Sequence, residues 1–116
     1  MMKSKNLKLA IVGLGYVGLP LALEFAKKRF IIGFDIDKKR IKDLNFGYDK
    51  NLEFKKKKIQ LKKLKFTNNV KDLISSNCYI ITVPTPIDKY KKPNLKPLFK
   101  ASEIIGKIIK KGDLII

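Results

Sequence analysis

Three glycines, at positions 13, 15 and 18, form the pattern in this sequence that most clearly points to chemistry. They follow an apolar run, residues 7–12, and precede a segment with apolar residues at helical spacing, so they fall where a strand turns into a helix. Gly13 would permit the sharp turn, Gly15 would let a pyrophosphate approach the backbone, and Gly18 would let the helix pack closely on the strand. Since free N–H groups at a helix start attract phosphate, residues 13–18 predict a dinucleotide site. A packing turn without a ligand is the alternative.

Asp35 is the second candidate, because it ends the next apolar run and lies 22 residues after Gly13. An acid at a spacing of about 20 residues accepts hydrogen bonds from the adenosine ribose and repels the extra phosphate of NADP, which favours NAD. Asp37 is the alternative acid, although its position suits a helix cap better. Lys38 and Lys39, which follow Asp37, leave NADP as an alternative cofactor. Arg40 would flank the adenine or the ribose, or would be an ordinary solvated helix residue.

The segment TVPTPID, residues 82–88, follows a further apolar run. In doubly wound sheets, ligands lie beyond the carboxyl ends of the strands, which is where this segment would lie. Its prolines would stiffen the loop without needing backbone donors, and Thr85 would offer a hydroxyl and an N–H to the cofactor. A proline-stiffened surface connection explains the spacing equally well.

Alternating strands and helices are needed to bring these residues together. Apolar runs indicate strands at residues 7–12, 30–34, 64–67, 78–83 and 113–116. Helices are expected at residues 18–28, 38–44 with Asp37 as cap, 52–63, from a cap at Asn68 or Asn69 to residue 75, and 98–110, the last burying Ala101, Ile104, Ile105, Ile108 and Ile109. This order predicts an α/β fold, a Rossmann-type doubly wound parallel sheet. The last strand runs to the end of the chain, so we expect a sheet truncated at its C-terminal end.

The composition excludes several classes of protein. A chain of 116 residues, 45% of them apolar, supports one folded domain. No apolar run is long enough to span a bilayer, and the basic start lacks a small-residue cleavage site, so we expect a cytoplasmic protein with no membrane partner. The absence of histidine and the single cysteine, Cys78, argue against histidine-based catalysis, a conventional zinc site and an internal disulfide.

The net charge of +17 is of the kind that attracts the phosphate backbone of nucleic acid. Only two of the 27 basic residues are arginines, however, and the lysines are spread along the chain. Arginine is the preferred residue for planar phosphate and base recognition, so a solvated basic surface is expected rather than a nucleic-acid site.

Three segments, GLGYVGLPLA, GFDIDKKRI and ITVPTPID, together resemble the UDP-glucose/GDP-mannose dehydrogenase family. The similarity extends from about residue 7 to residue 116 and is greatest to the branch that acts on UDP-N-acetylhexosamines in surface-polysaccharide synthesis. It implies that residues 1–116 are the NAD-binding portion of a homo-oligomeric enzyme that oxidises the C6 alcohol of a UDP-sugar to a carboxylate. Such enzymes use two NAD⁺ and form a thioester on a cysteine.

The resemblance, with the glycine turn, also assigns the residues expected to contact NAD. They are Gly13, Leu14, Gly15, Tyr16, Val17, Gly18, Asp35, Arg40 and Thr85. The family's catalytic cysteine, lysine and asparagine, and its UDP-binding domains, would lie beyond residue 116, so neither a catalytic nor a metal-binding residue is expected in this chain. Cys78 does not match the catalytic cysteine and is expected to be a packing residue. A Rossmann dehydrogenase of the β-hydroxyacid or 6-phosphogluconate type, or a non-enzymatic basic module that binds nucleic acid, is the alternative.

Overall fold

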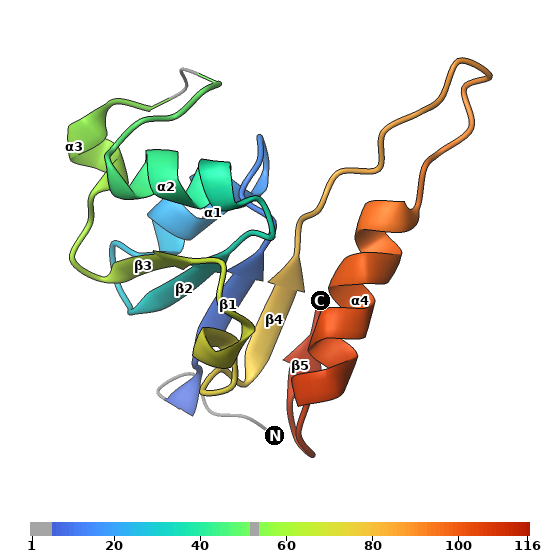
Figure 1. Cartoon of the computed structure of the whole chain (residues 1–116). Helices are drawn as coiled ribbons and strands as arrows, with labels where there is room; N and C mark the ends of the chain where they lie inside the picture. The colour runs from blue at the N-terminus through green and yellow to red at the C-terminus, as the bar shows by residue number, and fades with distance from the viewer. Residues whose placement is uncertain (1–5, 52–53) are drawn as a thin grey trace.

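The computed structural model, which describes residues 6–51 and 54–116, has a parallel β-sheet with helices on both faces (Figure 1). The five strands of the described residues are β1 (Leu9–Val12), β2 (Ile31–Phe34), β3 (Leu64–Thr67), β4 (Cys78–Ile81) and β5 (Leu114–Ile115). Their order across the sheet is β3-β2-β1-β4-β5, and every pair is parallel. The order reverses between β1 and β4, so the predicted doubly wound α/β fold is confirmed.

The helices divide between the two faces of this sheet. They are α1 (Gly18–Phe25), α2 (Lys38–Asn45), α3 (Lys56–Ile59), the 3₁₀ helix η2 (Val70–Leu73) and α4 (Lys96–Ile108). Figure 1 shows α1, α2 and α3 on one side and α4 on the other. None of the helices in the described part of the chain is both long and apolar enough to cross a membrane.

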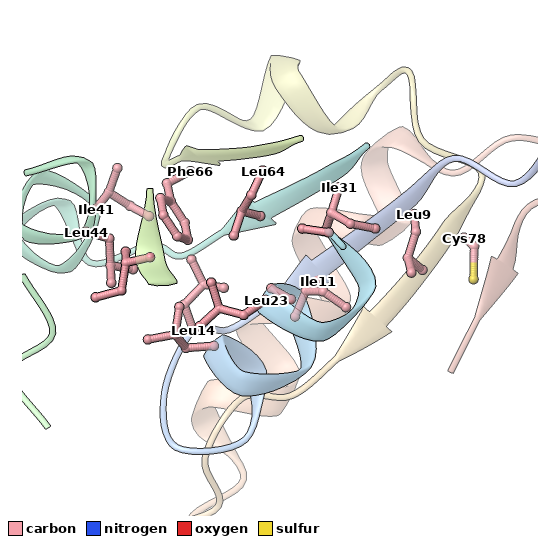
Figure 2. Close-up of a cluster of buried hydrophobic side chains, with 14 residues drawn as sticks. Leu9, Ile11, Leu14, Leu23, Ile31, Ile41, Leu44, Leu64, Phe66 and Cys78 are labelled. Atoms are coloured by element: carbon pink, nitrogen blue, oxygen red, sulfur yellow. The ribbon is translucent and has the colours of Figure 1, made fainter. Parts of the chain in front are cut away.

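Both faces of the central strand β1 are covered, which explains its uninterrupted apolar sequence. Leu9 and Ile11 belong to a core shared with α1 and α2, which also contains Leu14 from the glycine turn (Figure 2). Ala10 and Val12 point to the opposite core, shared with η2 and α4. The glycine turn therefore starts from a strand that is fixed on both sides.

Most predicted elements are present, with shorter bounds. β1 and β2 begin later than expected, and α1 ends at Phe25 rather than near residue 28. β4 ends at Ile81, since Pro84 has no N–H with which to continue a ladder. α4 starts at Lys96, two residues early, because Pro97 is well suited to a first helical turn.

Three expectations about the helices were wrong. Instead of a helix over residues 52–63, the described part of this stretch contains only the four residues of α3, and residues 52–53 lie outside the described residues. Only Ile59 of α3 is fully buried, which is too little apolar contact to extend a lysine-rich helix. The helix capped by Asn69 is a 3₁₀ helix that ends at Leu73. Ile109 follows α4 and is 40% exposed, so it does not join the core.

Candidate dinucleotide-binding site

A cavity of about 320 Å³ opens at the carboxyl ends of β1, β2 and β4, beside the point where the strand order reverses. Its lining comprises Val12, Gly13, Leu14, Gly15, Phe34, Asp35, Ile36, Asp37, Arg40, Lys50, Val83, Pro84, Pro97, Ala101 and Ile104. Four connections, which follow β1, β2, α2 and β4, therefore meet there together with α4. A mostly apolar hollow with a few converging polar groups is the usual form of a small-molecule site, and its position is the one that ligands take in doubly wound sheets.

The three glycines have separate structural roles, and those of Gly13 and Gly18 are the ones that were predicted. Gly13 has a φ of 105°, which side-chain-bearing residues rarely adopt, and this makes the sharp turn after β1. A Cβ on Gly18 would lie 1.7 Å from the Gly13 carbonyl oxygen, so α1 can begin this close to the turn only with glycine there. A Cβ on Gly15 would have no neighbour within 4 Å, which leaves open space above the backbone. Packing within the chain therefore does not require a glycine at position 15, and the backbone surface there is open.

Thr82 holds the turn from the β4 side, a role that the sequence reasoning missed. Its hydroxyl donates a hydrogen bond of 2.7 Å to the Gly13 carbonyl oxygen, and a Cβ on Gly18 would lie 2.5 Å from the same hydroxyl. The sequence did show Thr82 at the end of an apolar strand. What it did not show is that Val12 pairs with Ile81, which places the next residue of each strand side by side.

Asp35 contacts the glycine turn directly, while half-buried at the edge of the cavity. One carboxylate oxygen accepts the Leu14 N–H at 2.9 Å, and the other accepts the Asp37 N–H at 2.9 Å. Each oxygen keeps a further lone pair that can accept a ligand hydroxyl. The rival acid, Asp37, accepts the N–H groups of Lys39 and Arg40 and caps α2, as predicted. This division leaves Asp35 as the carboxylate available to a ribose.

Arg40 is not the solvated helix residue that one reading allowed, because it is only 4% exposed. Its Nε donates to the Leu14 carbonyl oxygen at 2.8 Å, and its Nη1 pairs with Asp49 at 2.7 Å. Nη2 is buried without a hydrogen-bond partner, and the residue lines the cavity. Burial of a guanidinium in this position requires a partner charge, which the sequence reasoning did not identify.

The remaining expected contact residues lie at the mouth of the site or beyond it. Tyr16 and Val17 are 70% and 66% exposed, in the turn that leads into α1, and neither is among the residues that line the cavity. Thr85 is also exposed, and it is not among the residues that line the cavity. Thr85 follows Val83 and Pro84, which do line the cavity, and it lies in a segment that Figure 1 shows extending away from the sheet.

Nothing in the described residues resembles a metal centre or a reactive thiol site. No group of three or more histidine, cysteine, aspartate or glutamate residues is placed to hold a metal ion there. Cys78 is 2% exposed at the start of β4, and burial raises the pKa of its thiol, so it is the packing residue that was expected.

The arrangement fits a dinucleotide in three respects. Gly15 leaves space at the start of α1, where backbone N–H groups attract a pyrophosphate. Asp35 has acceptor capacity for ribose hydroxyls, and a carboxylate beside a ribose would repel the extra phosphate of NADP. Arg40 lines the cavity, and its buried Nη2 has a donor capacity that no described residue uses.

The chain is also similar to known dehydrogenases. Residues 7–116 match the NAD-binding domain of the UDP-glucose/GDP-mannose dehydrogenase family. A UDP-N-acetyl-D-glucosamine 6-dehydrogenase of Pseudomonas aeruginosa is 56% identical over 113 residues, which are 97% of this chain and 27% of that protein. The corresponding enzyme of Salmonella typhi is 51% identical over 96% of this chain and 26% of its own length.

A solved structure shows the same fold. The UDP-D-ManNAc dehydrogenase of Pyrococcus horikoshii superposes with a TM-score of 0.85 at 35% identity, over 94% of this chain and 27% of that one. The chain thus spans about a quarter of the length of the relatives it matches. The chain therefore belongs to the UDP-glucose/GDP-mannose dehydrogenase family, in which it matches the NAD-binding domain.

Proposed function

We propose that this chain binds NAD⁺ in the cavity beside the glycine turn, with the pyrophosphate over Gly15 and the adenosine ribose at Asp35. The observation that carries the proposal is the open space above Gly15 next to a half-buried carboxylate, at the carboxyl edge of the sheet. Leu14 and Arg40 complete the floor, while Tyr16, Val17 and Thr85 would contact the cofactor from the exposed rim. The backbone N–H groups and positive end of α1 would then offset the charge of the pyrophosphate.

The activity that we propose for the whole protein is oxidation of a UDP-sugar at C6. Bound NAD⁺ would supply the hydride acceptor, while the residues of this chain hold and orient it. The names of the most similar relatives support a UDP-N-acetylhexosamine as substrate. Because the chain spans about 27% of those relatives, we assign the catalytic nucleophile, the sugar contacts and the contacts of a homo-oligomer to the remaining length.

We further propose a cytoplasmic location, with neither nucleic acid nor a membrane as partner. The one cysteine is a buried free thiol, the form that a reducing compartment maintains. A titration with duplex DNA at rising salt tests the second point. Weak, wholly salt-dependent binding is expected, and tight binding at physiological salt would contradict it.

Calorimetric titration with NAD⁺ tests the cofactor proposal. The chain should bind NAD⁺ saturably and NADP⁺ at least roughly tenfold more weakly, equivalent to about 1.4 kcal/mol. Gly15→Ala should weaken NAD⁺ binding without lowering stability, since its Cβ would enter the open space. The matched control is Gly106→Ala in α4, which also has no neighbour within 4 Å but lies outside the cavity.

Two outcomes would count against the proposal. Absence of saturable NAD⁺ binding by the folded wild-type chain would remove the cofactor site. Steady NADH production from NAD⁺ and a UDP-sugar by this chain alone would contradict the assignment of the catalytic groups to the remaining length of the relatives.

A further inference from the structure

The Arg40–Asp49 ion pair connects the glycine turn to the loop after α2. The two side chains are 3% and 0% exposed, and Nη1 lies 2.7 Å from Oδ1. Removing two charges from water is costly, and apolar residues of similar size often stabilise a fold as well or better. A fully buried pair therefore calls for an explanation other than stability.

Arg40 fixes one peptide group of the glycine turn. Its Nε–H donates to the Leu14 carbonyl oxygen at 2.8 Å, while the Leu14 N–H donates to Asp35 at 2.9 Å. The Leu14 carbonyl and the Gly15 N–H belong to the same trans peptide, so they point in opposite directions. Holding the carbonyl down on Arg40 thus turns the Gly15 N–H away from it. Within the described residues that N–H donates to no other group.

Asp49 determines how Arg40 can be placed. Its Oδ1 accepts both Nη1 of Arg40 and the backbone N–H of Asn51, at 3.1 Å, so the carboxylate is itself anchored to the loop after α2. With Nε and Nη1 engaged, Nη2 is the one nitrogen of the guanidinium that lacks a partner. The planar fork of arginine makes these three placements interdependent.

We propose that Asp49 is a positioning residue for NAD⁺ binding, which acts through Arg40. It holds the guanidinium so that Nε supports the Leu14–Gly15 peptide and Nη2 is left to donate to the cofactor. Asp49 itself does not line the cavity. This inference rests on the proposed NAD⁺ site and adds to it a residue from a connection that contains no recognisable nucleotide motif.

Asp49→Asn is the direct test, because it keeps the shape of the side chain and removes its charge. Calorimetry should show NAD⁺ binding weakened by roughly tenfold or more, about 1.4 kcal/mol. The matched control is Asp72→Asn, which removes the charge that accepts the Thr67 hydrogen bond and pairs with Lys65 but lies outside the cavity. It should bind NAD⁺ as the wild type does. Equal binding by Asp49→Asn and the wild type would overturn the inference.

A double-mutant cycle separates positioning from a general structural effect. Arg40→Lys keeps the charge but replaces the planar fork, whose separate nitrogens bond Leu14 and Asp49, by a single ammonium group. If Asp49 acts through Arg40, then Asp49→Asn should have little further effect on NAD⁺ affinity in the Arg40→Lys background. Additive losses would overturn the inference. Absence of binding by the wild type would instead defeat the proposed function, and the inference with it.

Arginine side-chain NMR tests the same geometry in the unaltered chain, should the variant fail to fold. The sequence has only two arginines, so Arg29→Lys assigns their signals. The Nε–H of Arg40 should exchange slowly with solvent, its Nη groups should give separate signals, and the Nη2 signal should shift saturably with NAD⁺ at the calorimetric affinity. Averaged Nη signals like those of the urea-unfolded chain, or no shift with saturating NAD⁺, would overturn the inference.

Discussion

Replacing Gly18 with alanine should destabilise the domain, because the added Cβ has no room where α1 begins. The added Cβ would lie 1.7 Å from the Gly13 carbonyl oxygen and 2.5 Å from the Thr82 hydroxyl, whereas real Cβ contacts are essentially never shorter than 3.0 Å. The backbone must therefore move by at least 1.3 Å, the difference between 1.7 and 3.0 Å. Since the closest obstruction is the main chain of the turn directly after β1, a strand buried on both faces, no side-chain movement can relieve it.

The cost follows from two contributions. Overpacking of a close contact costs about 1–3 kcal/mol. The hydrogen bond of 2.7 Å from Thr82 to Gly13 would also be displaced, and a typical net value is about 1 kcal/mol. Against these, alanine is favoured over glycine in a helix by up to about 1 kcal/mol. The expected net loss is about 1–3 kcal/mol, or a fall in Tm of about 4–12 °C for a domain of this size.

Urea unfolding followed by circular dichroism measures this difference. Gly106→Ala provides the opposite expectation in the same fold, because the residue lies within α4 and its Cβ would meet nothing within 4 Å. It should stabilise the domain by roughly 0.5–1 kcal/mol. Unfolding of Gly18→Ala within about 0.5 kcal/mol of the wild type, the usual range for a neutral surface change, would refute the reasoning about the close approach of α1 to the turn.

Three further substitutions or treatments test other parts of the fold. Tyr79→Phe removes a buried hydroxyl that is within hydrogen-bond distance of two carbonyl oxygens, at 3.0 and 3.1 Å, so urea unfolding should show a loss of about 1 kcal/mol, and no loss would contradict the bond. The hydrogen bond from Thr67 is the main cause that lowers the pKa of Asp72 in the folded chain. A group with a lowered folded-state pKa stabilises the fold above its unfolded-state pKa of about 3.9, and this stabilisation is lost as the pH falls through its folded-state pKa. Thr67→Val should therefore destabilise at pH 7, with a difference from wild type that narrows below about pH 4; a pH-independent difference would argue against the carboxylate. Burial raises the pKa of the Cys78 thiol, so a thiol reagent at mildly alkaline pH should label it in urea but only slowly in the native chain, and fast native labelling would contradict its burial.

Local sequence signals predicted the features that depend on one or two residues. Gly13 has the positive φ that the turn needs, Asp37 caps α2, and the apolar runs became the strands of a doubly wound sheet. Each of these follows from the conformational freedom or hydrogen-bonding capacity of a residue where it stands. The lysine-rich stretch before β3 was predicted to be a long helix. That prediction was wrong because the stretch does not supply the buried apolar contacts that stabilise a long helix.

The parts of the site that the sequence did not reveal all depend on contacts that only the folded chain creates. Thr82 reaches Gly13 only because β1 and β4 are neighbours, and Asp49 reaches Arg40 only because the loop after α2 folds back under the glycine turn. Aspartate and threonine are common loop residues, so neither position carries a signal of its own. Arg40 stood out as a candidate for the cofactor, but the partner that buries it could be found only in three dimensions.

The glycine turn is held by side chains from three separate parts of the chain. Thr82 bonds the Gly13 carbonyl, Asp35 bonds the Leu14 N–H, and Arg40 bonds the Leu14 carbonyl. A loop fixed before the ligand arrives does not have to be ordered at binding, and that ordering otherwise costs affinity. Each of the three side chains should therefore contribute to NAD⁺ affinity even where it does not touch the cofactor. On this reasoning the glycine motif defines the shape of the phosphate site, and the three polar supports determine how tightly that shape binds.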